Sequence, residues 1–204
     1  MIFVNQSTNF NSLERTISNK SQLYRFMIAD RKLLPLIDTE GSFMKPKITI
    51  KTPWQFIASG FGSGLSPIAP GTMGTLAAMP FWFLFASYLP LWGYLLIIII
   101  ASLAGIIICQ KASDELGVHD HGGIVWDEFV GMWITMICVP VSLTNAILGF
   151  LIFRFFDVLK PWPIKVIDEK VQGGFGIMLD DIIAAIFSLI SIHMILRWII
   201  PLFA

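Results

Sequence analysis

An uncharged apolar run from Leu91 to Cys109 is the feature that most restricts how this chain can fold. It is long enough to cross the hydrocarbon core of a bilayer as an α-helix, which takes roughly 20 apolar residues. Ile182–Phe203 is a second run of sufficient length. Over the whole chain 55% of residues are hydrophobic and only 14% are charged, whereas soluble domains are about 25% charged. We therefore expect an integral membrane protein built from helices.

Two further apolar stretches predict additional membrane helices. Leu76–Leu89 is short and is joined at Pro90 to the run that follows it. Val130–Phe156 predicts a hairpin with a turn near Val141–Asn145. Each arm would rise only about 17 Å, so either the hairpin is shallow or its ends lie recessed below the headgroups. Together the stretches predict an all-α, polytopic membrane helix bundle of about five membrane helices, counting the short hairpin as two.

Charge is unevenly distributed along the chain. Residues 1–51 carry an excess of basic residues and, because the formal net charge is zero, the remainder carries an equal acidic excess. We expect residues 1–45 to be a polar, basic and partly disordered extension, and residues 46–204 to form the membrane-embedded domain. No basic patch interleaved with aromatic residues occurs, which argues against nucleic-acid binding.

The basic residues also predict the orientation in the membrane. The connections near residues 90–92 and 142–145 contain no charge, whereas the basic residues between 111 and 170 fall at the opposite ends of the helices. Positively charged loops favour the cytoplasmic side. The pattern therefore predicts a cytoplasmic N-terminus and five crossings.

Two glycine-rich segments interrupt the apolar pattern. Ser59–Thr75 combines repeated glycines with two prolines, and Gln172–Asp181 opens with a glycine pair. Both compositions disfavour regular helix, so both segments are predicted to be loops at the cytoplasmic face. Such a loop can bring backbone amides close to a phosphate group, with Ser63 and Thr72 as additional donors. A linking or re-entrant loop without a ligand is the alternative.

Five carboxylates are expected to gather at one end of the bundle. Asp127 and Glu128 precede the hairpin, Asp157 ends it, and Asp180 with Asp181 precedes the last apolar run. Ionised carboxylates beside apolar surface are costly unless a cation neutralises them. Hard divalent cations such as Mg²⁺ prefer carboxylate oxygens. We therefore predict that these five acids form a metal site.

Basic and histidine residues lie near the same acids. Arg154 and Lys160 flank Asp157 and could hold phosphate oxygens. His119 and His121 precede Asp127 and Glu128, and all four are candidates for proton transfer. The alternatives are local: each acid could cap a helix, and each histidine could bond within its loop.

The same acids would also suit a cation transporter or channel, because acids line many ion pathways in membranes. Such a pathway favours acids near the middle of the bilayer and is often accompanied by inverted repeats, and no repeat is visible here. A lipid phosphotransferase that uses CDP-alcohols would need an Asp-Gly-containing motif, and no Asp-Gly pair occurs in the sequence. No cysteine-phosphatase, aspartyl-phosphate or nucleophile-elbow pattern occurs either. Metal-assisted hydrolysis without a protein nucleophile is the favoured chemistry.

The motifs that contain these residues resemble the bacterial phosphatidylglycerophosphatase A family. The similarity runs from about Pro53 to Ile190 and rests on GFGSGLSPIAPGTMGTLAA, VHDHGGIVWDEFVGMWIT, FRFFDVLKPWPI and GGFGIMLDDI. The resemblance implies a Mg²⁺-dependent inner-membrane enzyme that removes the terminal phosphate of phosphatidylglycerophosphate to give phosphatidylglycerol. It makes residues 46–204 the catalytic domain, and the family's acidic positions match Asp127, Glu128, Asp157, Asp180 and Asp181. The sequence specifies no oligomeric state.

Overall fold

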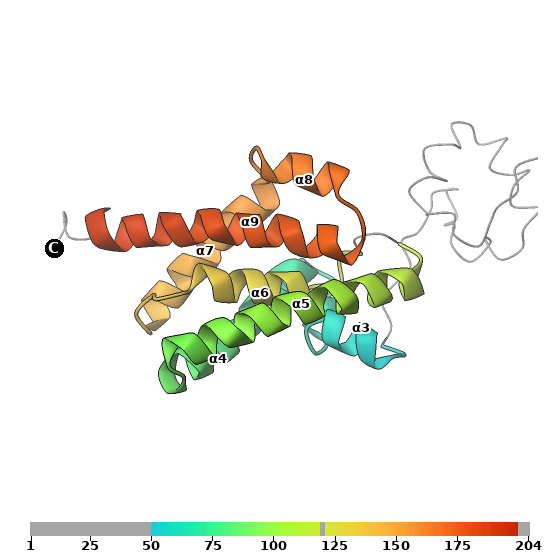
Figure 1. Ribbon diagram of the computed structural model, residues 1–204, viewed down its shortest axis with the longest axis horizontal. Coiled ribbons are helices and arrows are strands. Elements are labelled where there is room, and N and C mark those ends of the chain that lie inside the picture. Colours follow the sequence, from blue (N-terminus) through green and yellow to red (C-terminus); the bar gives the residue numbers. More distant parts are fainter. Residues whose placement is uncertain (1–49, 119–120, 200–204) are drawn as a thin grey trace, which may run out of the picture.

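The computed structural model describes residues 50–118 and 121–199. All regular elements in this part of the chain are helices, and loops join them. The predicted extension, residues 1–45, lies outside the described residues, as does His119. Figure 1 shows the described part as an elongated bundle in which α5 and α9 are the longest helices. The elements are α3 (Pro53–Ala58), η2 (Ser63–Leu65), α4 (Pro70–Tyr88), α5 (Leu91–Leu116), α6 (Trp126–Thr135), α7 (Leu143–Leu159), α8 (Ile164–Lys170), α9 (Gly173–Met194) and η3 (Ile195–Ile199).

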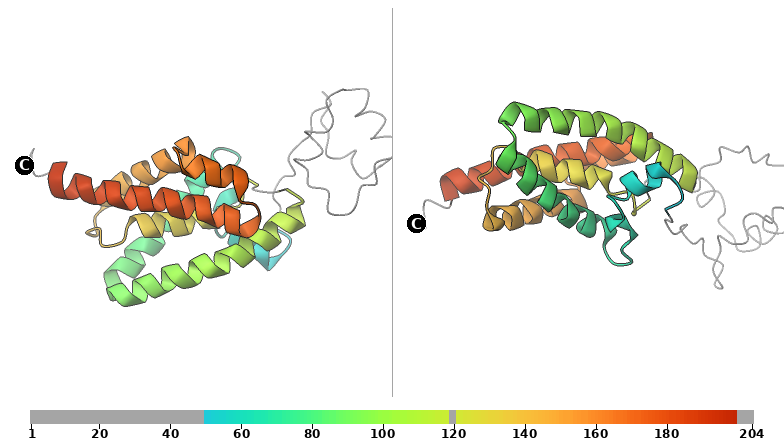
Figure 2. Two further views of the ribbon diagram at one scale, coloured as in Figure 1. Left: turned by 45° about the horizontal axis from the view of Figure 1, so that its top comes forward. Right: turned by 90° about the horizontal axis from the view of Figure 1, so that it is seen from below.

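The short helix α6 lies inside the bundle and is buried over most of its length (Figure 2). Three polar contacts of aromatic residues hold it against its neighbours. The indole of Trp133 donates to the carbonyl of Ala78 in α4 at 3.0 Å, and the hydroxyl of Tyr94 in α5 donates to the carbonyl of Trp133 at 2.5 Å. The indole of Trp126 donates to Ala101 in α5 at 3.1 Å. These contacts also fix the two acids in the first turn of α6.

The predicted glycine-rich loops are shorter than expected, because helix begins inside both of them. α4 starts at Pro70 and α9 starts at Gly173, so Asp180 and Asp181 lie inside α9 rather than before it. Expecting loop through Thr75 and through Asp181 was therefore wrong. Pro70 suits the first helical position because its missing N–H has no helical acceptor there.

Gly74 and Gly174, near these two helix starts, allow close packing. A Cβ atom on Gly74 of α4 would lie 2.6 Å from Cβ of Val125. A Cβ atom on Gly174 of α9 would lie 2.6 Å from the backbone nitrogen of Gln110 in α5. Small residues let helix backbones approach closely, which is common between membrane helices.

Two helical segments of the described chain are long and apolar enough to cross a membrane, Leu91–Leu116 and Gly173–Trp198. The predicted hairpin is present as α6 and α7, and Ser142 caps α7 by accepting from the backbone nitrogen of Asn145 at 3.1 Å. The 10 residues of α6 rise only about 15 Å, in keeping with a shallow arm.

The two ends of the bundle differ in character. At one end the α4–α5 and α6–α7 connections lie together, and Leu89, Leu91, Pro140 and Val141 line a cavity of about 320 Å³. The C-terminal end of the last helix lies at this end too (Figure 1). The opposite end holds α3, the starts of α4, α6 and α9, and the end of α7 (Figures 1 and 2). All five predicted acids lie in this second half.

Candidate active site

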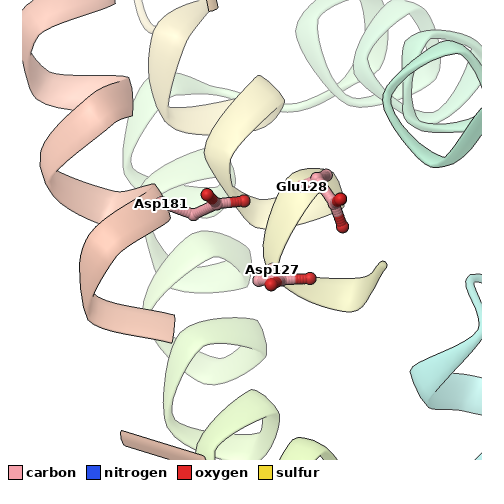
Figure 3. Close-up of side chains that lie close together, drawn as sticks. All are labelled: Asp127, Glu128 and Asp181. Atoms are coloured by element: carbon pink, nitrogen blue, oxygen red, sulfur yellow. The ribbon is translucent and has the colours of Figure 1, made fainter. Parts of the chain in front are cut away.

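Three carboxylates from two helices converge at the start of α6. Asp127 and Glu128 stand in its first turn, and Asp181 reaches toward them from α9 (Figure 3). One oxygen atom from each of the three lies within 4.8 Å of the others. Asp181 is only 4% exposed and Asp127 8% exposed, so the group is largely shielded from solvent.

Asp157 brings a fourth carboxylate and an arginine to this group. It lies in the last turn of α7, accepts a hydrogen bond from Arg154 and interacts electrostatically with Asp181. Nη1 of Arg154 also lies 3.9 Å from Oε1 of Glu128. The guanidinium therefore sits between two acids of the site.

Lys160 links α7, α8 and α9 beside the same group. It follows the last residue of α7, and its ammonium nitrogen lies 2.6 Å from Oδ2 of Asp180 in α9 and 2.9 Å from Oδ1 of Asp168 in α8. Burial alone would lower the pKa of Lys160, but the two aspartates outweigh burial and raise the pKa above its usual value. The side chain therefore stays charged at neutral pH.

Two buried carboxylate oxygens have no hydrogen-bond partner among the described residues, Oε2 of Glu128 and Oδ2 of Asp181. Buried acceptors without donors are costly and usually find a partner. A divalent cation is a partner that carboxylate oxygens accept readily. The carboxylate oxygens of the site thus fit a hard cation such as Mg²⁺.

A cavity of about 280 Å³ opens onto these side chains. All five predicted acids line it together with Arg154 and Lys160, so the ionised lining carries a formal charge of −3. A phosphate group alone would be repelled by that charge. The remaining walls come from the start of α4, the loop before α6 and the end of α7, through Ala69, Pro70, Gly71, Gly122, Ile124 and Val158.

Ser63 and Thr72, the predicted donors to phosphate, do not line this cavity. The hydroxyl of Ser63 donates to the carbonyl of Gly60 at 2.9 Å, within its own loop. Thr72 lies in the first turn of α4. Nδ1 of His121 accepts from the backbone nitrogen of Gly123 at 3.0 Å, and His121 is not a lining residue either.

Gly71 and Asp168 are site residues that the sequence did not indicate. A Cβ atom on Gly71 would overlap Oε1 of Glu128 and lie 3.2 Å from Nη1 of Arg154. The sequence shows that Gly71 lies within a glycine-rich segment, but it does not show which side chains Gly71 faces. Asp168 reaches Lys160 because α8 packs against α9, and the spacing of the two residues along the chain gives no sign of this.

Comparison with known proteins identifies the family of the chain. The profile of the family described as phosphatidylglycerophosphatase A matches residues 56–196, which contain all five acids. Phosphatidylglycerophosphatase A of Escherichia coli is 50% identical over 145 residues, covering 71% of this chain and 84% of the relative. Phosphatidylglycerophosphatase A of Haemophilus influenzae is 44% identical over 163 residues, covering 79% and 99%.

A further relative carries a different name. A putative phosphatidylinositol-3-phosphatase of Bacteroides thetaiotaomicron is 38% identical over 151 residues, which cover 71% of this chain and 93% of the relative. No solved structure matches the chain. The family profile and the two relatives at 50% and 44% identity agree, and the chain belongs to the phosphatidylglycerophosphatase A family.

Proposed function

We propose that this chain is a Mg²⁺-dependent lipid phosphatase that hydrolyses the terminal phosphate monoester of phosphatidylglycerophosphate in phospholipid biosynthesis. The observation that carries the proposal is the convergence of Asp127, Glu128 and Asp181 on a cavity that also contains Arg154 and Lys160. The family to which the chain belongs is named for this activity. The alternative of a cation transporter or channel has no support from the relatives, all of which are named as phosphatases.

Asp127, Glu128 and Asp181 are the residues that would hold Mg²⁺. Their oxygens are close enough to share one ion, and two of them contribute buried oxygens that lack a donor. When bound, the ion supplies Lewis-acid stabilisation of the charge that develops on the phosphate group. Asp157 and Asp180 are engaged by Arg154 and Lys160, so we assign them to positioning these two cations or to a second ion.

The phosphate group would be held between the acids and the start of α4. Arg154 and Lys160 both line the cavity and offer donors to phosphate oxygens. The first turn of α4 has no side-chain cap, and its N-terminal amides favour an anion. Gly71 lets this turn lie directly against Glu128 and Arg154.

Hydrolysis requires one water molecule as the nucleophile and no covalent bond between phosphorus and the protein. The water oxygen forms a bond to phosphorus, the phosphorus–oxygen bond to the glycerol breaks, and the glycerol oxygen takes up a proton. The products are phosphatidylglycerol and inorganic phosphate. Asp127 and Glu128 lie at the cavity and are the candidates for moving protons. His121 would assist only after a change in its loop, because it bonds to Gly123 and does not line the cavity.

We place the site at the cytoplasmic face of the bacterial inner membrane. The five crossings would be α4, α5, α6, α7 and the continuous segment α9–η3, where α6 and α7 form the hairpin. The N-terminus would lie inside. Two findings support this topology: the acids lie at one end of the bundle, and the uncharged α4–α5 and α6–α7 connections lie together at the other.

Phosphate release from lipid substrates tests the proposal. Purified full-length chain in detergent micelles is given phosphatidylglycerophosphate or phosphatidylinositol 3-phosphate, with Mg²⁺ or with a chelator. We expect Mg²⁺-dependent release, with kcat/KM at least about tenfold higher for phosphatidylglycerophosphate. No release from phosphatidylglycerophosphate would refute the function. Undiminished release in chelator would refute the role of the metal.

A further inference from the structure

The exposed residues that line the cavity differ in chemistry. Among the lining residues that the structure describes, Ala69, Gly122 and Val158 are exposed, whereas the carboxylates are largely buried. Gly122 belongs to the loop before α6. Ala69 and Val158 belong to the start of α4 and the end of α7, so one side of the opening has apolar edges.

The apolar edges extend beyond the opening. Ile68, next to Ala69, is 79% exposed, and Val158 is 66% exposed. Neither side chain contributes a charge or a hydrogen-bonding group. Large apolar side chains this exposed at the mouth of a polar cavity indicate contact with an apolar ligand or surface.

From Val158 an exposed apolar stripe runs back along α7 to Phe155, Leu151 and Ile147. These residues recur at helical spacing and therefore share one face. They span about 16 Å, close to half of the roughly 30 Å hydrocarbon core. The only charged residues of α7, Arg154 and Asp157, both line the cavity instead. The stripe is therefore continuous from the mouth of the cavity to the depth of a bilayer midplane.

A similar stripe follows α4 away from the cavity through Met73, Leu76 and Leu84, which are 40–53% exposed. α4 begins at the cavity and α7 ends there, so both stripes start at the two edges of the same opening. A lipid placed along them has its phosphate end at the carboxylates and its acyl chains beside the stripes.

We propose that the opening between Ile68 and Val158 is a lateral entrance through which the substrate lipid reaches the carboxylates from the surrounding leaflet. This proposal rests on the proposed function. The phosphate enters the cavity, the glycerol backbone lies over Ala69 and Val158, and the acyl chains remain in the bilayer along α4 and α7. The side of Gly122 admits water and releases phosphate.

A lateral entrance predicts that some substitutions lower kcat/KM for the lipid substrate alone. In the double variant Ile68→Ser/Val158→Ser, kcat/KM for dioleoyl phosphatidylglycerophosphate should fall about tenfold, since contact with two apolar side chains is lost. For the deacylated, water-soluble substrate it should change less than about twofold. The matched control is Leu103→Ser/Ile107→Ser, two residues of α5 that are 61% and 55% exposed. The control should leave both values within about twofold.

Equal losses on both substrates, or no loss on the lipid, would overturn the entrance. A wild type that hydrolyses neither substrate would instead overturn the proposed function, so the two failures are distinguishable. A second measurement does not depend on turnover. Wild-type protein is crosslinked with phosphatidylglycerophosphate that carries a diazirine in one acyl chain. Labelling should concentrate on residues 68–84 and 147–158 and be displaced by unlabelled substrate. Labelling spread equally over α5 would contradict the proposal.

Discussion

A Cβ atom at position 71 would overlap Oε1 of Glu128, so the carboxylate of Glu128 can lie in its present position against the start of α4 only because Gly71 has no side chain. The same Cβ atom would lie 3.2 Å and 3.3 Å from the two terminal nitrogens of Arg154. One glycine thus sets the distance between the proposed phosphate-binding helix start and two charged groups of the site.

Gly71→Ala should therefore impair catalysis more than folding. The carboxylate of Glu128 can move to accommodate the methyl group, but a shift of about 1 Å at a reacting site can cost roughly 100-fold in rate. We expect kcat/KM for phosphatidylglycerophosphate to fall by about that factor, with the melting temperature nearly unchanged. Gly122→Ala is the matched control, because a Cβ atom there would meet nothing within 4 Å in the same cavity. Equal activities of the two variants would contradict this role.

Lys160→Met should lower stability, since it leaves the carboxylate of Asp180, 6% exposed, without its cation. We expect a loss of about 2 kcal/mol in the free energy of unfolding. The pKa of Lys160 is raised in the folded state, so its contribution is complete below the unfolded pKa of about 10.4 and is lost only as the pH rises through the folded value. The difference from wild type should thus be constant between about pH 6 and 9.

Denaturation in detergent at several pH values measures this difference. Lys165→Met, an exposed lysine of α8, is the control and should change stability by less than about 0.5 kcal/mol. A difference that disappears by pH 9 would show that the lysine is not held charged.

The sequence predicted the helices, the hairpin and the convergence of acids, because apolar run length and charge asymmetry follow from the bilayer itself. It misplaced the starts of α4 and α9, because glycine disfavours isolated helix but also allows the close packing of Gly74 against Val125. The pairing of Asp157 with Arg154 follows from their i,i+3 spacing on one helix, but the sequence could not reveal that Asp181 joins Asp127 and Glu128. Which acids share an ion depends on how three helices are rotated against one another, and that is a property of tertiary packing.

Mg²⁺ should stabilise the wild type more than Asp181→Asn, because an asparagine keeps the size but loses the charge that the ion requires. At about 100 times the dissociation constant the wild type should gain about 2.7 kcal/mol. Without Mg²⁺ the variant should be at least as stable as the wild type, since one of several neighbouring carboxylates has been removed. Melting curves over a range of Mg²⁺ concentrations test both statements. Equal Mg²⁺-induced shifts would show that Asp181 is not a ligand.

The proposed topology can be tested with an impermeant thiol reagent added to intact cells. Native Cys138 is exposed and lies in the α6–α7 connection, so it should itself react from outside. In a Cys138→Ser background, a cysteine at Ser142 should react and one at Gly122 should not. Labelling at Gly122 from outside would place the cavity on the opposite face.

The most direct test of the central claim is phosphate release by Glu128→Gln, Asp157→Asn and Asp181→Asn at saturating Mg²⁺, with a melting curve for each variant. Asp114→Asn, an exposed residue of α5 outside the cavity, is the control. We predict that all three site variants fold yet lose at least about 100-fold in kcat/KM, while the control keeps wild-type turnover. Near-wild-type turnover in all three would contradict a carboxylate metal site and leave these acids with a structural role alone.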